Sequence, residues 1–429
     1  LYWNPGGIRG HIRELTTLAQ SQDIHVILLG ETKLTDSVDL RIPNFFVYRR
    51  DEVSPRGYAY RGTAALVRRD VIHEELEHAP YTSLRSQGVR VHNGAEELLL
   101  YAAYRPPNTN FVSTDVHTLF ESRSPTLIVG DLNAKHQAWG SRIANTAGRY
   151  LLEDSERHHY GVLGPGSPTN IPVDCRCSPD VLDIVLHHRT DHPISVEALY
   201  DLDTEHLPIL VTLNLQRDFT IPRPPRLKTD WEKYATALSE LELAGPILTP
   251  EDVDQAAVHI MTAIQTAKDG ATTMHKPAGR RDLLPRSLRD KLSKKRNLRK
   301  QWARTRCPRI KRDLNRLSEQ VSLALVMQEE YDWGATIDTA SESETSLYHL
   351  CKTLTGTTTP VYPLLDSQGR RRYSAKDRAE IMADYMEGQF TPNPLATDDT
   401  THRHIAAINQ QVGEFLSASF PPLRGEDFI

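Results

Sequence analysis

The stretch from Thr126 to Ser141, TLIVGDLNAKHQAWGS, constrains the fold more than any other part of the chain. A run of four apolar or β-branched residues leads directly into Gly130 and Asp131. Such a run is typical of a buried strand that ends in a turn. In open α/β sheets, ligands bind beyond the carboxyl ends of the strands. The sequence therefore predicts a strand that delivers Asp131 to a sheet edge, where its carboxylate can accept a proton from water.

Asn133 follows this aspartate after one intervening residue. If the extended geometry persists, the two side chains share a general orientation, and the amide of Asn133 can donate to a phosphate oxygen. The alternative interpretation is an Asx turn at the end of a strand, which is a common local structure without chemistry. The tetrapeptide GDLN is compatible with both.

Further polar residues stand at or beside other apolar runs. Asn4 lies in LYWNPGG, Glu31 ends the run IHVILLG, Asp183 lies inside VLDIVLHH, and His206 opens HLPILVTL. Taken singly, they have ordinary interpretations: a turn residue before a proline, a solvated carboxylate at a strand end and a surface histidine. Their value lies in the ordered set that they form with Asp131.

In the order Asn, Glu, Asp with Asn, Asp and His, this set resembles the exonuclease-endonuclease-phosphatase fold, whose members hydrolyse phosphodiesters or phosphomonoesters with magnesium. Tyr104 in AAYRPPN adds a seventh match. The combination of WN, GET, YRPP, GDLNAKH, PDVLDIVL and EHLPI is similar to the endonuclease domain of jockey-type non-LTR retrotransposons. The resemblance spans about residues 1 to 217 and continues more weakly to the chain end.

The resemblance implies an α/β fold class, with two packed, mainly antiparallel or mixed β-sheets flanked by helices in a four-layer α/β sandwich. The residue pattern fits this arrangement. Apolar spacing predicts helices at Ile8–Ala19, Val112–Phe120 and Asn145–Glu156, and strands at Phe45–Tyr48, Thr63–Val67, Gly88–Val91, Leu98–Tyr104, Ile194–Ala198 and Leu207–Leu215. A loop rich in Pro, Gly, Asn and Cys is expected from Pro165 to Pro179.

The resemblance also implies the catalytic residues. Asp131 positions or deprotonates the attacking water, Asp183 orients the ring of His206, and His206 donates to the scissile phosphate. Tyr104 and Asn133 donate to oxygens of the same phosphate. Glu205 supports this group, although it stands where the family usually has aspartate, so the acid is one methylene longer.

Glu31 is the best candidate for the ligand of a Mg²⁺ ion, since this ion is usually held by one or two carboxylates and keeps several waters. By resemblance Asn4 lies beside it in the metal shell, and Mn²⁺ is an alternative cofactor.

Four residues are candidates for DNA contact, His136 and Thr169 among them by resemblance: Arg105, His136, Thr169 and Asp180. For the first three the alternatives are a solvated arginine, a loop histidine and a turn-capping threonine. Asp180 stands where the wider superfamily often has serine, and a carboxylate there places negative charge close to a bound phosphate.

A chain of 429 residues exceeds a usual single core, so several domains are expected. The segment RDFTIPRPP, rich in proline and arginine, predicts an extended linker. The predicted organisation is an endonuclease-like domain at 1–217, a Pro-rich linker at 218–226, a helical and partly basic connector at 227–390, and a poorly structured tail at 391–429 that leads to an absent reverse transcriptase.

The net charge of −5 argues against a uniformly basic surface, but the charge is unevenly distributed. Arg280 to Arg316 carries sixteen Lys or Arg against three Asp, a local net of 16 − 3 = +13, so the remainder carries −5 − 13 = −18. Such a segment forms either a solvated helix face or a surface that contacts phosphates. Its apolar spacing predicts a helical hairpin broken near Pro308.

Composition excludes several classes of protein. The 39% hydrophobic and 25% charged fractions are those of a soluble globular chain. Four scattered cysteines give no disulfide framework, which favours a reducing compartment. The longest apolar run, seven residues from Leu98 to Tyr104, falls short of the roughly 20 that a membrane span needs. Because the chain lacks an initiator Met, we expect it to begin inside a longer reading frame.

The sequence therefore predicts a magnesium-dependent endonuclease that nicks one strand of duplex DNA and leaves a 3′-hydroxyl. By resemblance, that end primes reverse transcription of the element's RNA in the nucleus, after synthesis of the protein in the cytoplasm. No aromatic-x-Asp-Asp polymerase signature occurs, so this chain is expected to cut and not to copy. Two alternatives remain: a phosphatase of the same fold, and a catalytically degenerate nucleic-acid-binding fragment that uses the basic segment.

Overall fold

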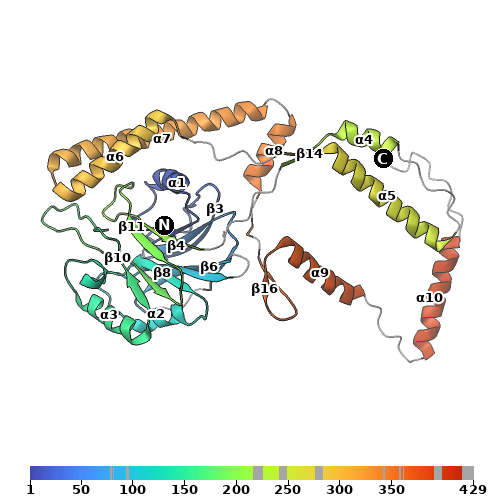
Figure 1. Cartoon of the computed structure of the whole chain (residues 1–429), viewed down its shortest axis with the longest axis horizontal. Helices are drawn as coiled ribbons and strands as arrows, with labels where there is room; N and C mark the ends of the chain where they lie inside the picture. Colours follow the sequence, from blue (N-terminus) through green and yellow to red (C-terminus); the bar gives the residue numbers. More distant parts are fainter. Residues whose placement is uncertain are drawn as a thin grey trace. The chain divides into compact units, whose positions relative to one another are not determined.

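The computed structural model describes residues 1–77, 80, 82–92, 96–215, 226–240, 249–275, 284–341, 344–356, 359–360, 362–390 and 399–417. The chain divides into two compact units, Leu1–Val361 and Tyr362–Ile429. The first unit contains two six-stranded β-sheets, called sheet 1 and sheet 2 below (Figure 1).

Sheet 1 has the strand order β11-β12-β1-β2-β4-β3. Its strands are β1 (Tyr2–Trp3), β2 (Val26–Leu29), β3 (Phe45–Val53), β4 (Ala59–Arg68), β11 (Ile194–Ala198) and β12 (Ile209–Leu213). Only β1 and β2 pair in parallel, and the other neighbours are antiparallel. The two parallel strands therefore end at the same edge of the sheet.

Sheet 2 has the strand order β5-β6-β7-β8-β10-β9. Its strands are β5 (His73–Glu75), β6 (Arg85–His92), β7 (Glu97–Tyr104), β8 (Thr126–Asp131), β9 (Gly161–Leu163) and β10 (Asp183–His188). Here β7 and β8 are the parallel pair, between antiparallel neighbours. Gly130 allows the close approach of these two strands, because a Cβ atom at this position would run into the carbonyl oxygen of Ala103.

The two sheets pack face to face, and helices cover their outer faces. In β8, Leu127 and Val129 pack into the core between the sheets, whereas Ile128 packs into the outer core with the helices. Side chains of a strand alternate between faces, so a strand buried on both faces is apolar throughout. This explains the continuous apolar run that precedes Asp131.

Three helices form the outer layers. α1 (Ile12–Ser21) packs on sheet 1 through Leu15 and Leu18, while α2 (Ser113–Phe120) and α3 (Thr146–His158) pack on sheet 2 (Figure 1). The predicted helix at Asn145–Glu156 is confirmed, and Asn145 is its N-cap, accepting a hydrogen bond from the nitrogen of Gly148 at 2.8 Å. The four-layer α/β sandwich predicted for the first half of the chain is confirmed.

A helical hairpin follows in the first unit. α6 (Arg286–Thr305) and α7 (Pro308–Ser341) pack against each other through Leu288 and Val321. Arg306, in the turn between them, has the left-handed φ of 55° that often ends a helix. The predicted break near Pro308 is confirmed, because this proline begins the second helix.

The remaining elements are shorter or lie outside the sandwich. In the first unit they are the 3₁₀ helix η1 (Gln137–Trp139), the antiparallel strands β13 (Arg226–Thr229) and β14 (Thr272–His275), and helices α4 (Trp231–Ser239), α5 (Pro250–Ala271) and α8 (Glu344–Thr355). The second unit contains the antiparallel strands β15 (Leu364–Leu365) and β16 (Arg371–Arg372) and helices α9 (Ala375–Phe390) and α10 (Asp399–Ser417). Helices dominate both sets.

The predicted domain boundaries stay predictions. All but the last residue of the expected linker at 218–226 lies outside the described residues, and Arg226 begins β13. Of the tail expected to be poorly structured, residues 399–417 form α10, whereas 391–398 and 418–429 lie outside the described residues. No helix in the part of the chain that the structure describes combines the length and apolar character that a membrane span requires.

Candidate active site

The parallel strands of sheet 1 bring Asn4 and Glu31 to one edge. Trp3 is the register partner of Leu29, and the nitrogen of Gly30 donates to the carbonyl oxygen of Trp3 at 3.0 Å. Asn4 and Glu31 follow directly after this last ladder bond. The strand pairing therefore places both predicted metal ligands at the same sheet end.

Sheet 2 brings three predicted residues together in the same way. Tyr104 at the end of β7 is the register partner of Asp131 at the end of β8, and Asp183 at the start of β10 is its partner on the other side. Three neighbouring strands thus supply a phenol and two carboxylates. Asp131 and Asp183 are buried, with exposed fractions of 2% and 0%.

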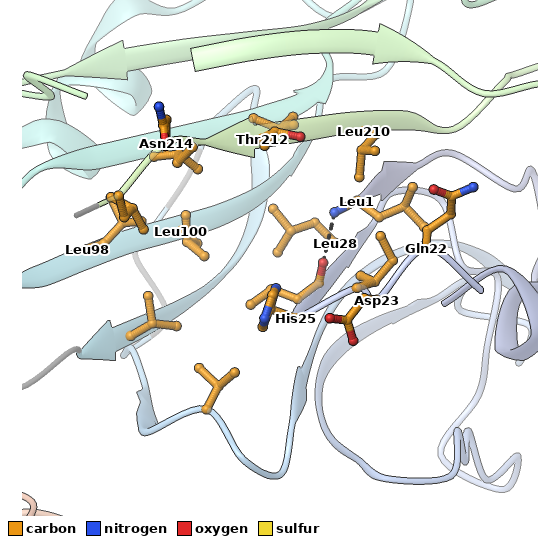
Figure 2. Close-up of a pocket in the computed structure, with 17 residues that line it drawn as sticks. Leu1, Gln22, Asp23, His25, Leu28, Leu98, Leu100, Leu210, Thr212 and Asn214 are labelled. Carbon is orange, nitrogen blue, oxygen red and sulfur yellow. Dashed lines mark hydrogen bonds between the residues drawn. The ribbon is translucent and has the colours of Figure 1, made fainter. Parts of the chain in front are cut away.

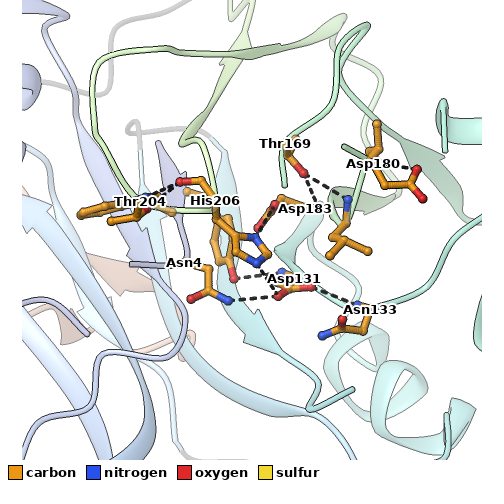
Figure 3. Close-up of polar contacts among 12 residues, drawn as sticks. Asn4, Asp131, Asn133, Thr169, Asp180, Asp183, Thr204 and His206 are labelled. Carbon is orange, nitrogen blue, oxygen red and sulfur yellow. Dashed lines mark hydrogen bonds and ion pairs between the residues drawn. The ribbon is translucent and has the colours of Figure 1, made fainter. Parts of the chain in front are cut away.

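Side-chain hydrogen bonds join the two sheet edges into one site (Figure 3). The amide of Asn4 donates to Oδ2 of Asp131 at 3.0 Å, and both groups are buried. Glu31 and Asp131 both raise the pKa of Tyr104 through their negative charge, so the two carboxylates lie near the same phenol. Residues 31 and 131 therefore belong to one constellation, as the predicted hydrolytic centre requires.

His206 completes the constellation from the loop before β12. Its Nδ1 lies 2.9 Å from Oδ2 of Asp183, and its Nε2 lies 3.7 Å from Oδ2 of Asp131 (Figure 3). The first distance is that of a hydrogen bond and the second is longer. With Nδ1–H donated to Asp183, the Nε2–H group remains available to another acceptor.

The charges of these residues depend on one another. Burial lowers the pKa of His206, but Asp183 and Asp131 raise it more, and the resulting pKa is about 9. Burial raises the pKa of Asp131 to about 7, although the positive charge of His206 opposes this rise. Near neutral pH the site therefore holds an imidazolium beside a carboxylate that can take up a proton.

Asn133 does not continue the extended geometry. β8 ends at Asp131, and Asn133 has a left-handed φ of 47°. Its nitrogen donates to Oδ1 of Asp131 at 3.1 Å, which is the Asx turn named as the alternative. Its side-chain nitrogen donates to the carbonyl oxygen of Arg105 at 2.9 Å, which occupies one of the two amide hydrogens and leaves the other for a ligand.

The hydroxyl of Tyr104 lies near the carboxylate of Glu31. Burial and the negative charge of Glu31 raise its pKa, so the phenol keeps its proton. The Glu31 carboxylate also lies 3.1 Å from Nζ of Lys33. Donation from Tyr104 to a phosphate, as predicted from the sequence, stays a prediction.

The donors at the sheet edges fit a hard divalent cation. Asn4 and Glu31 supply a carboxamide and a carboxylate oxygen, the ligand types that Mg²⁺ prefers. Asp131, Asp183 and His206 also form a group whose ligand-type atoms lie within 4.8 Å of one another. However, an imidazolium with a pKa of about 9 repels a cation, and Asp183 already binds that ring, so the oxygens of Asn4 and Glu31 are the better set.

Arg105 and Thr169 have internal partners instead of solvent-facing positions. Arg105 is 3% exposed and donates to the carbonyl oxygens of Leu132 at 2.6 Å and Asn133 at 2.9 Å. Thr169 is fully buried, and its hydroxyl accepts hydrogen bonds from the nitrogens of Leu182 and Asp183, each at 3.1 Å. In this structure Arg105 shapes the turn after β8 and Thr169 caps the segment that leads into β10, so the predicted DNA contacts are corrected to positioning contacts.

Asp180 is likewise buried, so its predicted placement against a phosphate is corrected. Its carboxylate lies 3.1 Å from Nζ of Lys135 and accepts from the nitrogen of Arg142 at 2.9 Å. These partners neutralise the charge that the sequence placed beside the substrate. Lys135 had no role in the sequence analysis, and no local pattern identifies it as the partner of a residue 45 positions later.

Glu205 and His136 lie on the rim. Glu205 is exposed, and its carboxylate accepts from the nitrogen of Val173 at 2.8 Å, so its support of His206 stays a prediction. His136 is partly exposed and accepts from the nitrogen of Ala138 at 3.1 Å as the N-cap of η1. His136 therefore has a structural contact, and its DNA contact stays a prediction.

A separate apolar pocket lies away from these residues. It opens between strands of the two sheets and is lined by Leu28, Leu98, Leu100 and Leu210, among others (Figure 2). None of the predicted site residues lines it. Its only labelled charged or titratable side chains are Asp23 and His25, which is a poor match to a polyanionic substrate.

Comparison with known proteins supports the motif-based prediction. Residues 98–210 match the model of the endonuclease-reverse transcriptase family. The chain is 27% identical over 426 residues to a probable RNA-directed DNA polymerase from transposon X-element of Drosophila melanogaster, covering 96% of this chain and 46% of that protein. It is 26% identical over 434 residues to the RNA-directed DNA polymerase from mobile element jockey of the same species, with 97% and 46% covered.

The chain thus spans about half the length of the curated relatives it matches. Among solved structures, the endonuclease domain of TRAS1, a telomere-specific non-LTR retrotransposon, aligns with 15% identity and a TM-score of 0.41, covering 50% of this chain and 98% of that one. The predicted resemblance is confirmed: residues 98–210 match the endonuclease-reverse transcriptase family, and the whole chain is similar to the RNA-directed DNA polymerases of the jockey and X elements.

Proposed function

We propose that this chain is a magnesium-dependent endonuclease that nicks one strand of duplex DNA and leaves a 3′-hydroxyl. The observation that carries the proposal is the buried group of Asp131, Asp183 and His206, with the Nδ1 of His206 2.9 Å from Asp183. Phosphodiester hydrolysis needs a proton acceptor for water and positive charge at the phosphate, and this group supplies both.

Asp131 is the proposed general base. Its carboxylate is fixed by Asn4 and by the nitrogen of Asn133, so it is oriented before substrate binds. Burial raises its pKa to about 7, which is closer to the working pH than the pKa of a solvated carboxylate. Asp131 thus orients a water molecule and accepts its proton as the water attacks phosphorus.

His206 is the proposed electrophilic group. Asp183 holds its Nδ1–H and stabilises the imidazolium, which leaves Nε2–H to donate to a phosphate oxygen as negative charge develops there. A fixed, buried donor is effective for this purpose because it does not need to reorganise during the reaction. The free N–H of Asn133 can donate to the same phosphate.

Asn4 and Glu31 are the proposed ligands of Mg²⁺, or of Mn²⁺. When bound, such an ion neutralises phosphate charge and stabilises the departing oxygen. In the protein itself, the pairing of β1 with β2 brings Asn4 and Glu31 to one sheet edge, and Nζ of Lys33 lies 3.1 Å from the Glu31 carboxylate.

A role in retrotransposition is proposed from the relatives. Their names identify them as RNA-directed DNA polymerases of mobile elements, and this chain spans about half of their length. We infer that the nicked 3′-end primes copying of the element's RNA by a linked reverse transcriptase, and that this takes place in the nucleus.

A nicking assay tests the proposal. Supercoiled plasmid is incubated with Mg²⁺ and the full chain, its Asp131→Ala and His206→Ala variants, and the control Asp39→Ala, whose side chain is exposed. We expect open-circular DNA with the wild type and the control, and a rate lower by about 10²- to 10⁴-fold in the two site variants. The ends formed should be extended by a DNA polymerase, which requires a 3′-hydroxyl.

The same assay separates the alternatives. Faster hydrolysis of small phosphomonoesters than of plasmid favours a phosphatase. Plasmid binding that survives Asp131→Ala, without nicking under any metal condition, favours a degenerate binding fragment. Asp180 and Glu205, the two acidic residues that depart from the family pattern, both have partners in the fold and leave the group of Asp131, Asp183 and His206 intact.

A further inference from the structure

The basic helix α6 has an inner face that is buried. Lys295, Arg299 and Trp302 have exposed fractions of 1%, 2% and 1%. Their spacing of four and three residues places them on one side of a helix. Lysine and arginine are almost never fully buried unless they are paired, so this face has specific partners. The charged segment was expected to form a solvated helix face. This is true only of the opposite side of α6, where Lys300 and Arg304 are exposed.

Arg299 binds the segment that carries His206. Its guanidinium lies 3.0 Å from Oδ1 of Asp203 and also donates to the carbonyl oxygen of Thr204. Asp203 receives further support from Ser318 of α7, whose hydroxyl donates to Oδ2 at 3.1 Å. Burial raises the pKa of Asp203, but the charges of Arg299, Lys311 and Lys295 together lower it more, so the resulting pKa is below the usual value. The helical hairpin thus holds main chain two residues before the catalytic histidine.

Trp302 packs on the other side of the same segment. It forms a small apolar cluster with Leu207, which directly follows His206, and with Ile171. The guanidinium groups of Arg299 and Arg306 lie 4.9 and 4.4 Å from the centre of its ring, at distances typical of cation–π contacts. Both flanks of His206 therefore rest on α6, through the Thr204 carbonyl and through the Leu207 side chain.

α6 is also anchored to the rest of the sandwich. Nζ of Lys295 lies 2.7 and 2.6 Å from the two carboxylate oxygens of Glu14 on α1, which packs on sheet 1. Breaking a buried ion pair by removing one partner leaves an unpaired charge, so such pairs fix one geometry. This anchor sets where Arg299, four residues later on the same face, meets the loop.

The sandwich also holds the loop directly. Nε1 of Trp3 donates to Oγ1 of Thr204 at 3.2 Å and to the carbonyl oxygen of His206 at 3.0 Å, and the nitrogens of Ile171 and Leu207 form main-chain hydrogen bonds with Glu205 and Thr169, each at 2.7 Å. The carboxylate of Asp203 is held by the hairpin, through Arg299, Lys311 and Ser318.

We propose that α6 is required for the nuclease activity. Arg299 and Trp302 are positioning residues that hold the Asp203–Leu207 segment, so that His206 stays hydrogen bonded to Asp183. The proposal rests on the proposed function. It places essential residues beyond the predicted domain limit of 217, in a helix whose charge had pointed only to solvent or nucleic acid. Residues that orient a reacting group typically change its rate by about 10- to 100-fold.

The test compares Arg299→Ala with Arg304→Ala in the full chain. Both changes remove an arginine from α6. Arg304 is exposed, and among the described residues it has no contact with the Asp203–Leu207 segment. We expect Arg299→Ala to lower kcat for plasmid nicking about 10- to 100-fold with KM changed less than about twofold, and Arg304→Ala to retain wild-type kcat. Arg299→Lys, which keeps the charge beside Asp203 but not the forked donor, should fall between them.

Hydrogen exchange supplies a readout that does not depend on activity. In Arg299→Ala, the amides of residues 203–207 should exchange at least about tenfold faster than in the wild type or in Arg304→Ala, while those of β8 and β10 keep their protection. Unchanged exchange of this segment in Arg299→Ala overturns the proposal, as does a loss of nicking that the Arg304→Ala control shares.

Failure of the proposed function gives a different result. If the wild-type chain does not nick but Arg299→Ala still speeds hydrogen exchange of residues 203–207, the nuclease assignment is wrong. The finding that Arg299 holds this loop then stands by itself. Should Arg299→Ala fail to fold, Trp302→Leu, which keeps an apolar side chain against Leu207, takes its place in the exchange measurement, and unchanged exchange there likewise overturns the proposal.

Discussion

The hydroxyl of Tyr2 accepts a hydrogen bond from the main-chain nitrogen of Asp131 at 2.9 Å and donates one to the carbonyl oxygen of Ala103 at 3.1 Å. Tyr2 belongs to sheet 1, whereas Asp131 and Ala103 end neighbouring strands of sheet 2. One buried phenol therefore ties the two sheets together directly behind the proposed general base. Tyr2 was not among the site residues predicted from the sequence, since an aromatic residue in a short apolar strand is an ordinary core residue.

Tyr2→Phe should destabilise the protein by about 1–3 kcal/mol, because it leaves a buried nitrogen and a buried carbonyl without a partner. Thermal unfolding checks this, with Tyr58→Phe as the control, since Tyr58 is 72% exposed. Equal melting temperatures for the two variants would contradict the structural role assigned to Tyr2. We also expect slower nicking by Tyr2→Phe, because the turn that carries Asp131 loses a contact.

The nicking rate should show a bell-shaped dependence on pH. Activity requires Asp131 without its proton and His206 with it. Since burial raises the pKa of Asp131 to about 7, the rate should rise as the pH increases through about 7. Since Asp183 and Asp131 together outweigh burial and raise the pKa of His206 to about 9, the rate should fall above about 9. A pH–rate profile under kcat/KM conditions measures both limbs, and a rate that still climbs above pH 10 contradicts the role of His206.

Asp183→Asn should lower the pKa of His206. Burial favours the neutral ring, and the charge of Asp183 is the largest influence that opposes it, so the asparagine variant loses the main stabilisation of the imidazolium. Titration of the His206 Cε1 proton by NMR, without added metal, measures this directly. Asp191→Asn, at an exposed position, should leave the value unchanged. If the pKa of His206 stays near 9 in Asp183→Asn, Asp183 is not the residue that stabilises the imidazolium.

Glu31→Gln should weaken the response to Mg²⁺. Glutamine has nearly the same shape as glutamate, so the fold is kept while the negative charge is lost. We expect the Mg²⁺ concentration for half-maximal nicking to rise at least about tenfold, because hard cations depend on charged oxygen ligands. Glu153→Gln, on the exposed side of α3, is the matched control. The same Mg²⁺ requirement in both variants would rule out Glu31 as a ligand.

Much of the sandwich was predictable because it rests on local patterns. The apolar run before Asp131 is a strand because both of its faces are buried, and the helix after Asn145 begins where its cap residue stands. The family resemblance predicted that Asn4 lies beside Glu31 and that Tyr104 and Asp131 share a site, and the structure brings each pair together at the ends of two parallel neighbouring strands. The motifs supplied the rest of this set through a family resemblance.

The exceptions are residues whose partners are distant in the chain. Arg105, Thr169 and Asp180 looked available for DNA from their neighbours in sequence, yet each is buried against backbone or a cation that no periodicity reveals. For Asn133 the sequence was compatible with both an extended strand and an Asx turn, and the structure has the Asx turn, with a local hydrogen bond to Asp131 after β8 ends.

The sequence by itself determined where strands and helices form and which acids, amides and histidine stand at their ends, since hydrophobic periodicity and turn chemistry act over a few residues. Only the tertiary structure decided that β1 lies between β12 and β2, that Tyr2 meets Asp131 across two sheets, and that Arg299 holds a carbonyl 95 residues earlier in the chain. The physical reason is that burial of a polar group selects its partner by position in space, and sequence separation carries no information about that position.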